Sequence, residues 1–381
     1  MGERTRQALP SVLSVLLSLL VCWMLIAFSR DMDGMATATA AYLQMLWGGV
    51  GDWPRFLDGA PATVLTRPLG EAAMKAALLT LTGLSVAVAF KVGLFNIGAQ
   101  GQMLLGALAA AVVGAHLALP GALHIPAALL AAALAGGAWA GIAGALKLYR
   151  GVHEVISTIM LNWVAVRLVD NWLVVGPLRG VAEAGASITG TAEIHPTATL
   201  PRLLGDMSRL NLGFVIAALA AVAVWAWLTR TRSGFETRAV GLGDEAARAA
   251  GIPVARRAGL AMALAGALAG LAGAVLVLGT EGRYPGTLGA PYGFDGIAIA
   301  LIGNNHPLGV GAAALFFGVL RAGGTRMQLL DVHKSFPELI QGLALLFVAG
   351  RLIWLAALRR RSAPKPATAA PPAPAAQVPH A

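Results

Sequence analysis

Residues 69–102 decide the fold: they read LGEAAMKAALLTLTGLSVAVAF and then, without a spacer, KVGLFNIGAQGQ. Segment 69–90 can cross a bilayer as one helix, which needs about 20 mainly apolar residues. The segment that follows places amides among glycines, and each glycine costs a helix about 1 kcal/mol relative to alanine. Irregular backbone at membrane depth is tolerated only where protein or a water-filled cavity surrounds it. The stretch predicts a membrane helix that leads into a broken helix, with a plain cytoplasmic turn as the alternative.

Comparable apolar runs recur along the chain, and 57% of its 381 residues are apolar while 12% are charged. Such a composition excludes a soluble domain of this length. The stretch 287–320 is interrupted by Gly303-Asn304-Asn305-His306-Pro307 and predicts two short crossings or a re-entrant hairpin. Spans are expected at 11–29, 69–90, 103–119, 126–146, 155–175, 211–228, 258–280 and 336–357.

The fold class predicted from these runs is all-α, a polytopic transmembrane helical bundle of 8–10 spans with broken or re-entrant helices. It should occupy residues 1–357. Residues 358–381 are rich in proline and alanine and predict a disordered cytoplasmic tail.

The basic residues indicate topology, because Arg and Lys collect in short cytoplasmic loops. They concentrate in 229–257, in 147–154 and at Arg359–Arg361, whereas 30–68 and 176–210 balance basic with acidic residues. We therefore expect loops 30–68 and 176–210 to face outward and both termini to face the cytoplasm. The formal charge of +10 is explained by this distribution and does not indicate nucleic-acid binding.

The N-terminal region has a second interpretation. Residues 1–40 could form a cleaved signal peptide, since Arg4 and Arg6 precede an apolar stretch and Ala36-Thr37-Ala38 resembles a cleavage site. The apolar run is longer than the roughly 7–15 residues of a signal core, which favours a retained membrane helix.

A second polar, glycine-rich break follows span 258–280, with Tyr284-Pro285-Gly286 and then 289–296 before another apolar run. This span and span 69–90 run in opposite directions in the predicted topology, and each leads into such a break. The pattern indicates an inverted repeat, in which the substrate site lies where the broken segments meet.

Polar side chains within apolar runs predict a solute path, because burying them is costly unless they line a cavity or find a partner. Amides suit a neutral solute, since they donate and accept hydrogen bonds without adding charge. The alternative is that these side chains only bridge helices. The residues expected to line the path are Asn96, Gln100, Gln102, Asn162, Asp295 and Asn304. Glu71 and Lys75, four residues apart, are expected to form an interfacial pair.

Several functions are excluded by missing motifs. The chain has no G-x-x-x-x-G-K-[ST] sequence, so ATP must be hydrolysed by another polypeptide. Gly241-Leu-Gly243-Asp-Glu-Ala246 matches a dinucleotide motif, but a short loop between spans cannot hold the required fold. The seven histidines are scattered and the single cysteine, Cys22, lies in an apolar run, so neither a metal site nor a thiol enzyme is predicted.

The cytoplasmic loop around 238–253 predicts a short helix with acids at its start and Gly251 and Pro253 at its end. Such a helix could pass a partner's motion to the spans, and a solvated connector is the alternative. The residues assigned to coupling are Arg238, Asp244, Glu245, Ala246, Ala247, Arg248 and Gly251.

Four motifs together resemble the permease subunits of bacterial ABC importers in the branched-chain amino acid, ribose and nucleoside superfamily, closest to the nucleoside and simple-sugar branch. The resemblance covers about residues 65–355. Gln100 and Trp163 stand where the branch favours Glu and Tyr, which leaves the exact solute open. The motifs are Phe95–Gln102, His153–Asn162, the loop Gly241–Gly251 and Gly293–Asn304.

The resemblance implies a multi-pass protein of the bacterial inner membrane that imports purine nucleosides, with simple sugars as the second choice. It implies a second permease chain, a cytoplasmic ATPase that holds ATP and Mg²⁺, and an extracytoplasmic solute-binding protein. No cofactor is expected in this chain. An ion-coupled secondary transporter is the remaining alternative, and its coupling site would have to be Asp295, the one ionisable residue firmly placed inside an apolar run.

Overall fold

The computed structural model describes residues 3–29, 33–180, 190–288 and 291–362, with side chains between Ser11 and Gly350. This part of the chain is built from α-helices and contains two isolated β-bridges, Gly190 with Pro285 and Arg202 with Asn211. The expectation of an all-α polytopic bundle is confirmed.

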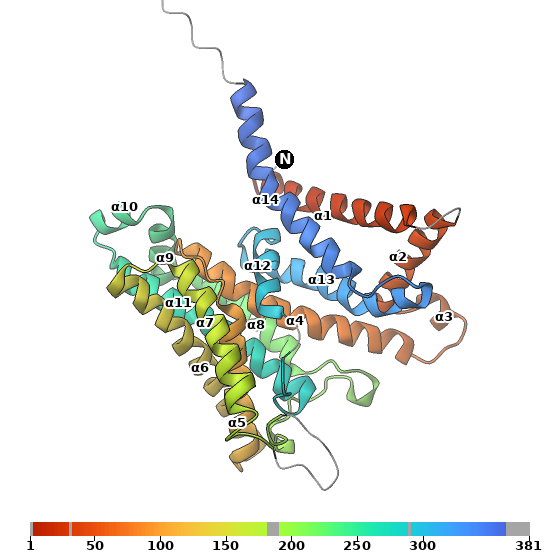
Figure 1. Ribbon diagram of the computed structural model, residues 1–381, viewed down its shortest axis with the longest axis horizontal. Coiled ribbons are helices and arrows are strands. Elements are labelled where there is room, and N and C mark those ends of the chain that lie inside the picture. Colours follow the sequence, from red (N-terminus) through yellow and green to blue (C-terminus); the bar gives the residue numbers. More distant parts are fainter. Residues whose placement is uncertain (1–2, 30–32, 181–189, 289–290, 363–381) are drawn as a thin grey trace, which may run out of the picture.

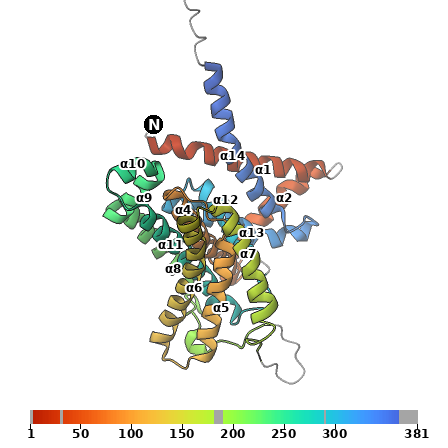
Figure 2. The same ribbon diagram turned by 60° about the vertical axis from the view of Figure 1, so that its left-hand side comes forward.

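The helices are arranged so that α4 runs from the end of the molecule that carries α2 and α3 to the end that carries α9 and α10 (Figure 1, Figure 2). π-helical turns continue α7 at Val169–Leu173 and α11 at Val277–Glu281. The helices are α1 (Glu3–Phe28), α2 (Gly34–Val50), α3 (Trp53–Leu57), α4 (Thr63–Lys91), α5 (Ala99–His116), α6 (Gly121–Arg150), α7 (Glu154–Leu168), α8 (Leu212–Arg230), α9 (Arg232–Leu242), α10 (Asp244–Ala249), α11 (Val254–Leu276), α12 (Tyr292–Ile302), α13 (Pro307–Met327) and α14 (Phe336–Ser362).

Membrane-spanning length and composition are met by six helical segments in the described residues. The outward faces of these helices carry large apolar side chains, including Leu130, Leu134 and Leu219, as a lipid-facing surface requires. α12 and the described part of α14 up to Gly350 are apolar but shorter. The six segments are Ser11–Phe28, Thr63–Lys91, Gly121–Arg150, Leu212–Arg230, Val254–Glu281 and Pro307–Leu330.

Three expected boundaries differ from the structure. The loop expected at 30–68 contains α2, a helix that lies against α13 because Gly48 and Gly49 leave room for Gly323 and Val319. The stretch 287–320 forms one short helix, α12, and one long helix, α13. α14 continues to Ser362, past the expected end of the membrane domain at 357, and residues 363–381 of the expected tail lie outside the described residues.

The long helices α4 and α11 occupy equivalent positions in the bundle. α4 lies against α12 and α13, and α11 lies against α5 and α6, so each contacts the two helices that follow the other one's break. Small residues permit both contacts: a Cβ at Gly318 of α13 would lie 2.6 Å from the Ala72 carbonyl oxygen of α4, and Gly136 of α6 meets Gly270 of α11 in the same way. This exchange of neighbours agrees with the expected inverted repeat.

Candidate functional site

The break between α4 and α5 is closed by a reciprocal pair of amides. Gly93, at φ 82°, turns the chain away from α4. Asn96, which is fully buried, donates from Nδ2 to Gln102 Oε1 at 2.9 Å and to Ser85 Oγ at 3.3 Å. In return Gln102 Nε2 and the Gly98 amide donate to Asn96 Oδ1 at 2.9 and 3.0 Å. Every hydrogen-bonding position of the Asn96 side chain is therefore occupied.

Asn162 of α7 completes the same cluster. Its Oδ1 accepts from the Gly101 amide at 2.8 Å, and its Nδ2 donates to the Ile97 carbonyl oxygen at 2.8 Å. It thus satisfies one of the free amides in the first turn of α5, which have no partner within the helix. A Cβ at Gly101 would lie 2.9 Å from Ala165 Cβ, so α5 and α7 touch closely here.

The two broken segments meet at the start of α12. Gln100 Oε1 accepts from the Gly293 amide at 2.8 Å, and a Cβ at Gly293 would collide with the backbone of Gln100. The first turns of α5 and α12 therefore lie in direct contact, as the repeat predicts.

The cluster formed by Asn96, Gln100, Gln102 and Asn162, here called the amide cluster, does not line an open path. All four side chains are buried and bonded to neighbouring helices or loops. Their contacts are those of the alternative, in which they bridge helices, and that they face the solute stays a prediction. Their polarity was visible in the sequence, but their mutual pairing depends on how the helices meet.

The other two residues of the expected path lie apart. Asn304 is exposed in the turn between α12 and α13, with φ 56°, at the opposite end of α12 from Asp295. Asp295 joins a different group of polar residues. The expected site residues are therefore not brought together as one lining.

Asp295 is the centre of a charged cluster on α12, α13 and α14. Its Oδ2 lies 2.7 Å from Arg321 Nη1, and its Oδ1 accepts from Gln341 Nε2 at 3.2 Å. Arg321 also faces the Tyr292 ring at 5.7 Å, within cation–π range. We name Asp295, Arg321 and Gln341 the charged cluster.

Lys75 of α4 extends toward this cluster and donates to the Arg321 carbonyl oxygen at 3.0 Å. Glu71 instead lies 3.3 Å from Arg209, so the expected Glu71–Lys75 pair is wrong. Lys75 lies 12 residues into α4, roughly 18 Å from its first residue along the axis. An ionisable group at such depth in a spanning helix marks a functional position by default.

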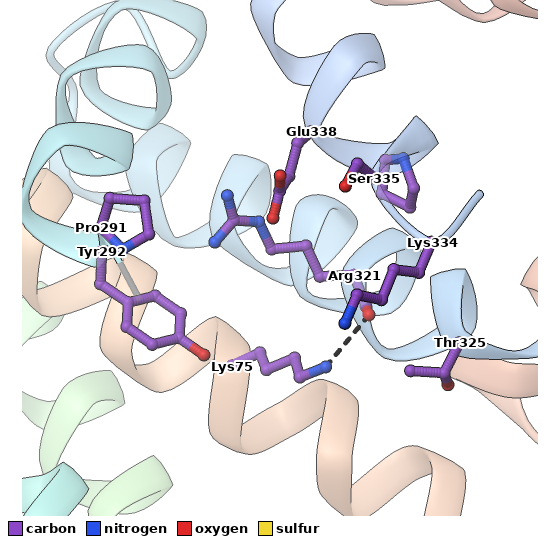
Figure 3. A pocket seen from close by; sticks show the side chains of 9 residues that line it. Lys75, Pro291, Tyr292, Arg321, Thr325, Lys334, Ser335 and Glu338 are labelled. Carbon is purple, nitrogen blue, oxygen red and sulfur yellow. Dashed lines mark hydrogen bonds between the residues drawn. The ribbon is translucent and has the colours of Figure 1, made fainter. Parts of the chain in front are cut away.

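A polar cavity of about 260 Å³ opens between Lys75, Tyr292 and Arg321 (Figure 3). Lys334 and Glu338, from the segment before α14 and its first turn, close the other side. The cavity adjoins a second one of about 540 Å³ that shares Lys75 and Thr325 and is lined by the loop 202–209. Both lie toward the end of α4 that the charge pattern predicts to face outward.

Sequence analysis missed Arg321, Gln341, Glu338 and Lys334. The apolar stretch was expected to end at 320, which made Arg321 look like a flanking residue, whereas α13 continues to Met327 and encloses it. In the sequence Arg321 directly follows an apolar run. This pattern does not show whether the residue lies inside the helix or beyond its end.

The loop 229–257, which the charge pattern predicts to be cytoplasmic, forms two helices instead of one. Arg238 belongs to α9, while Asp244 and Glu245 begin α10, which ends at Ala249. Gly251, at φ 78°, turns the chain toward Pro253 at the start of α11.

Within α10 the expected coupling residues differ in exposure. Asp244, Glu245, Ala246 and Arg248 are exposed, and Ala247 is buried against the rest of the loop. Arg248 lies 4.0 Å from Asp244, as an exposed pair that contributes little.

α9 is attached to the membrane helices at both of its ends. Glu236, nearly buried, lies 2.9 Å from Arg232 and 2.5 Å from Arg257 at the start of α11. Gly241 touches the backbone of Lys91 so closely that a Cβ would collide with it. The hydrogen bond from Arg232 and the ion pair with Arg257 hold the pKa of Glu236 below its usual range.

The chain has many apolar helices, two polar helix breaks that meet at its centre, and a basic hairpin at one end. These features are typical of a polytopic membrane transport protein. Residues 69–349 match the family model of the permease component of the branched-chain amino acid transport system, and the chain belongs to this family. It is a multi-pass ABC transporter permease. Its relatives are permease subunits, so the chain is not itself a catalytic subunit.

Three relatives share most of their length with the chain. The guanosine ABC transporter permease protein of Bacillus subtilis is 41% identical over 74% of this chain and 80% of its own. The glucose ABC transporter permease protein of Haloferax volcanii is 38% identical over 74% and 75%. The nucleoside ABC transporter permease protein of Lactococcus lactis is 34% identical over 75% and 80%. The expected likeness to nucleoside and sugar permeases is confirmed.

Proposed function

We propose that this permease carries purine nucleosides across the bacterial inner membrane, into the cell, with both termini in the cytoplasm. The observation that carries the proposal is the 41% identity to a guanosine permease over 74% of the chain. The family match over 69–349 contains the amide cluster, the cavity and the loop 229–257. A simple sugar is the second candidate, because a glucose permease is 38% identical over a similar share.

The proposal is tested by uptake into sealed vesicles that contain the complete transporter. Radiolabelled guanosine should accumulate when ATP is supplied on the cytoplasmic side and continue when the proton gradient is collapsed. Uptake of glucose but not guanosine would favour the sugar candidate. Uptake that needs no ATP and follows an imposed pH gradient would contradict ATP-driven import.

We infer that the chain works with a cytoplasmic ATPase, which holds ATP and Mg²⁺, a second permease chain and an extracytoplasmic solute-binding protein. The absence of a P-loop in this sequence supports a separate ATPase. The α9–α10 hairpin is the proposed ATPase contact, since it projects at the end of the bundle where the arginines of 229–257 collect.

Cysteine crosslinking distinguishes contact from proximity at this hairpin. Cysteine at Ala246, which is exposed, should crosslink to the ATPase, whereas cysteine at the buried neighbour Ala247 should react more slowly. Reversing the charges of Glu245 and Arg248 together should lower transport-stimulated ATP hydrolysis while the protein stays inserted. An active complex in which Ala246→Cys never crosslinks would contradict the assignment.

A further inference from the structure

The charged cluster has hydrogen-bonding capacity that no described residue uses. Arg321 Nε and Gln341 Oε1 are buried and have no hydrogen-bond partner among the described residues. The Arg321 side chain is 10% exposed, although its guanidinium lies beside the cavity of Figure 3. A buried donor without a partner is costly, so a guanidinium that lines a cavity and is incompletely paired points to a ligand that supplies a further acceptor.

The groups around Arg321 define the chemistry that the cavity accepts. Tyr292 presents an aromatic ring, Lys75 and Arg321 offer donors, and Glu338 offers carboxylate acceptors. The cavity has three cationic side chains, Lys75, Arg321 and Lys334. The carboxylates of Asp295 and Glu338 offset two of these charges. A nearly balanced cavity with a ring, donors and acceptors suits a neutral molecule with a flat heterocycle and several hydroxyl groups.

We propose that this cavity is a solute-binding site on the outer half of the permease, with Tyr292, Arg321 and Glu338 as direct contacts. This inference rests on the proposed function, because it takes a neutral nucleoside as the solute. Tyr292 stacks on the base, Glu338 accepts from ribose hydroxyls, and the Arg321 guanidinium donates to an acceptor of the solute. Asp295 and Gln341 are positioning residues, because they hold the guanidinium through an ion pair and a hydrogen-bonded carboxylate.

The contact of Gly293 with Gln100 connects this site with the break of the other repeat. Tyr292 lines the cavity, and the next residue donates its amide to the amide cluster. A solute that displaces Tyr292 therefore acts directly on the junction of α5 and α12.

Cysteine protection tests occupancy directly, because the native Cys22 is buried and adds little background reaction. Ser335→Cys places a thiol in the cavity wall, and Thr199→Cys, on an exposed loop of the same end, is the matched control. In the complete transporter, saturating guanosine should slow maleimide labelling of Ser335→Cys at least threefold and leave Thr199→Cys unchanged. Glucose serves as the second probe in the same assay.

Substitutions test which groups make contact. Arg321→Lys keeps the charge beside Asp295 but removes Nε, and should raise the KM for guanosine about tenfold, the equivalent of one hydrogen bond. Tyr292→Leu should raise KM to a similar extent, while Arg150→Lys, at an exposed position at the end of α6, should not. Maximal rate, basal ATP hydrolysis and melting temperature should stay near wild type, which a purely structural role would not allow.

The outcomes separate the two proposals. If the wild-type complex transports neither guanosine nor glucose, the proposed function fails. Suppose instead that it transports one of them. If that solute does not protect Ser335→Cys, and its KM is the same in Arg321→Lys as in wild type, the cavity is not a solute site. Protection by the transported solute together with a changed KM supports it.

Discussion

The amide cluster and the charged cluster lie on either side of the Gln100–Gly293 contact, yet they differ in how completely their polar groups are used. Asn96 and Gln102 satisfy each other in both directions, and Asn162 is bonded at both ends. In the charged cluster Arg321 Nε and Gln341 Oε1 have no hydrogen-bond partner among the described residues, and Arg321 lines a cavity. A fully satisfied network fixes one arrangement of helices, whereas an incompletely satisfied one retains capacity for another molecule.

This difference changes the interpretation of polar residues in membrane helices. Their presence alone indicates either a path or a helix contact, and the count of unused donors and acceptors separates the two. By this criterion the amide cluster bridges helices, and the charged cluster is the part of the proposed solute site that retains unused capacity.

The largest effect is expected when the amide cluster is broken. Asn96→Leu leaves Gln102, the Gly98 amide and Ser85 without their partner, at about 1–3 kcal/mol for each group that stays buried and unpaired. Detergent-solubilised protein should therefore melt well below wild type and accumulate to lower levels. Asn304→Gly, at an exposed position with positive φ, is the matched control and should behave as wild type. A normal melting temperature for Asn96→Leu would remove the distinction between the two clusters.

A smaller loss is expected when both members of the amide pair are replaced. In Asn96→Leu with Gln102→Leu the two apolar side chains face each other and no side-chain amide is stranded, although the Gly98 amide and Ser85 still lack their partner. The double variant should therefore be more stable than the sum of the single changes predicts. A coupling energy of about 1 kcal/mol or more in a double-mutant cycle of unfolding would demonstrate this interaction between Asn96 and Gln102. Strictly additive losses would mean that the reciprocal bonds contribute nothing together.

Gln341→Met, a change in the charged cluster, should have little effect on stability. The change removes an acceptor that has no partner among the described residues, together with donor bonds of 3.2 Å to Asp295 Oδ1 and 3.5 Å to the Asp295 carbonyl oxygen, so the expected shift is within about 1 kcal/mol. Thermal melting of the purified chain measures it. A loss as large as that of Asn96→Leu would show that the charged cluster holds the fold as firmly as the amide cluster.

The smallest effect concerns Glu236, a carboxylate between two arginines that lies outside the candidate membrane spans. Because the folded-state pKa of Glu236 is lowered, its contribution is present above the usual Glu pKa of about 4.3 and is lost as pH falls through the lowered folded value. Melting temperature should drop less steeply in Glu236→Gln than in wild type between pH 5 and about pH 3. Parallel profiles for the two proteins would mean that Arg232 and Arg257 do not stabilise this carboxylate.

Much of the architecture follows from the sequence alone. Apolar runs of bilayer length located most spanning helices, and glycines beside amides located the breaks after α4 and before α12. These features are local, because a helix in lipid must satisfy its own backbone and therefore needs a continuous apolar run. α2 lacks that signature, because it has 17 residues, fewer than the roughly 20 that a spanning helix needs.

What only the tertiary structure decided is which polar group meets which. Asn96 and Gln102 are six residues apart, but Asn162, Gln100 with Gly293, and Asp295 with Arg321 and Gln341 come from separate helices. The sequence determined that these side chains are polar and buried in an apolar environment, which makes pairing necessary. The partner, and whether any capacity remains for a solute, depends on the crossing points of helices set by Gly101, Gly293 and Gly318, and these contacts join residues far apart in the chain.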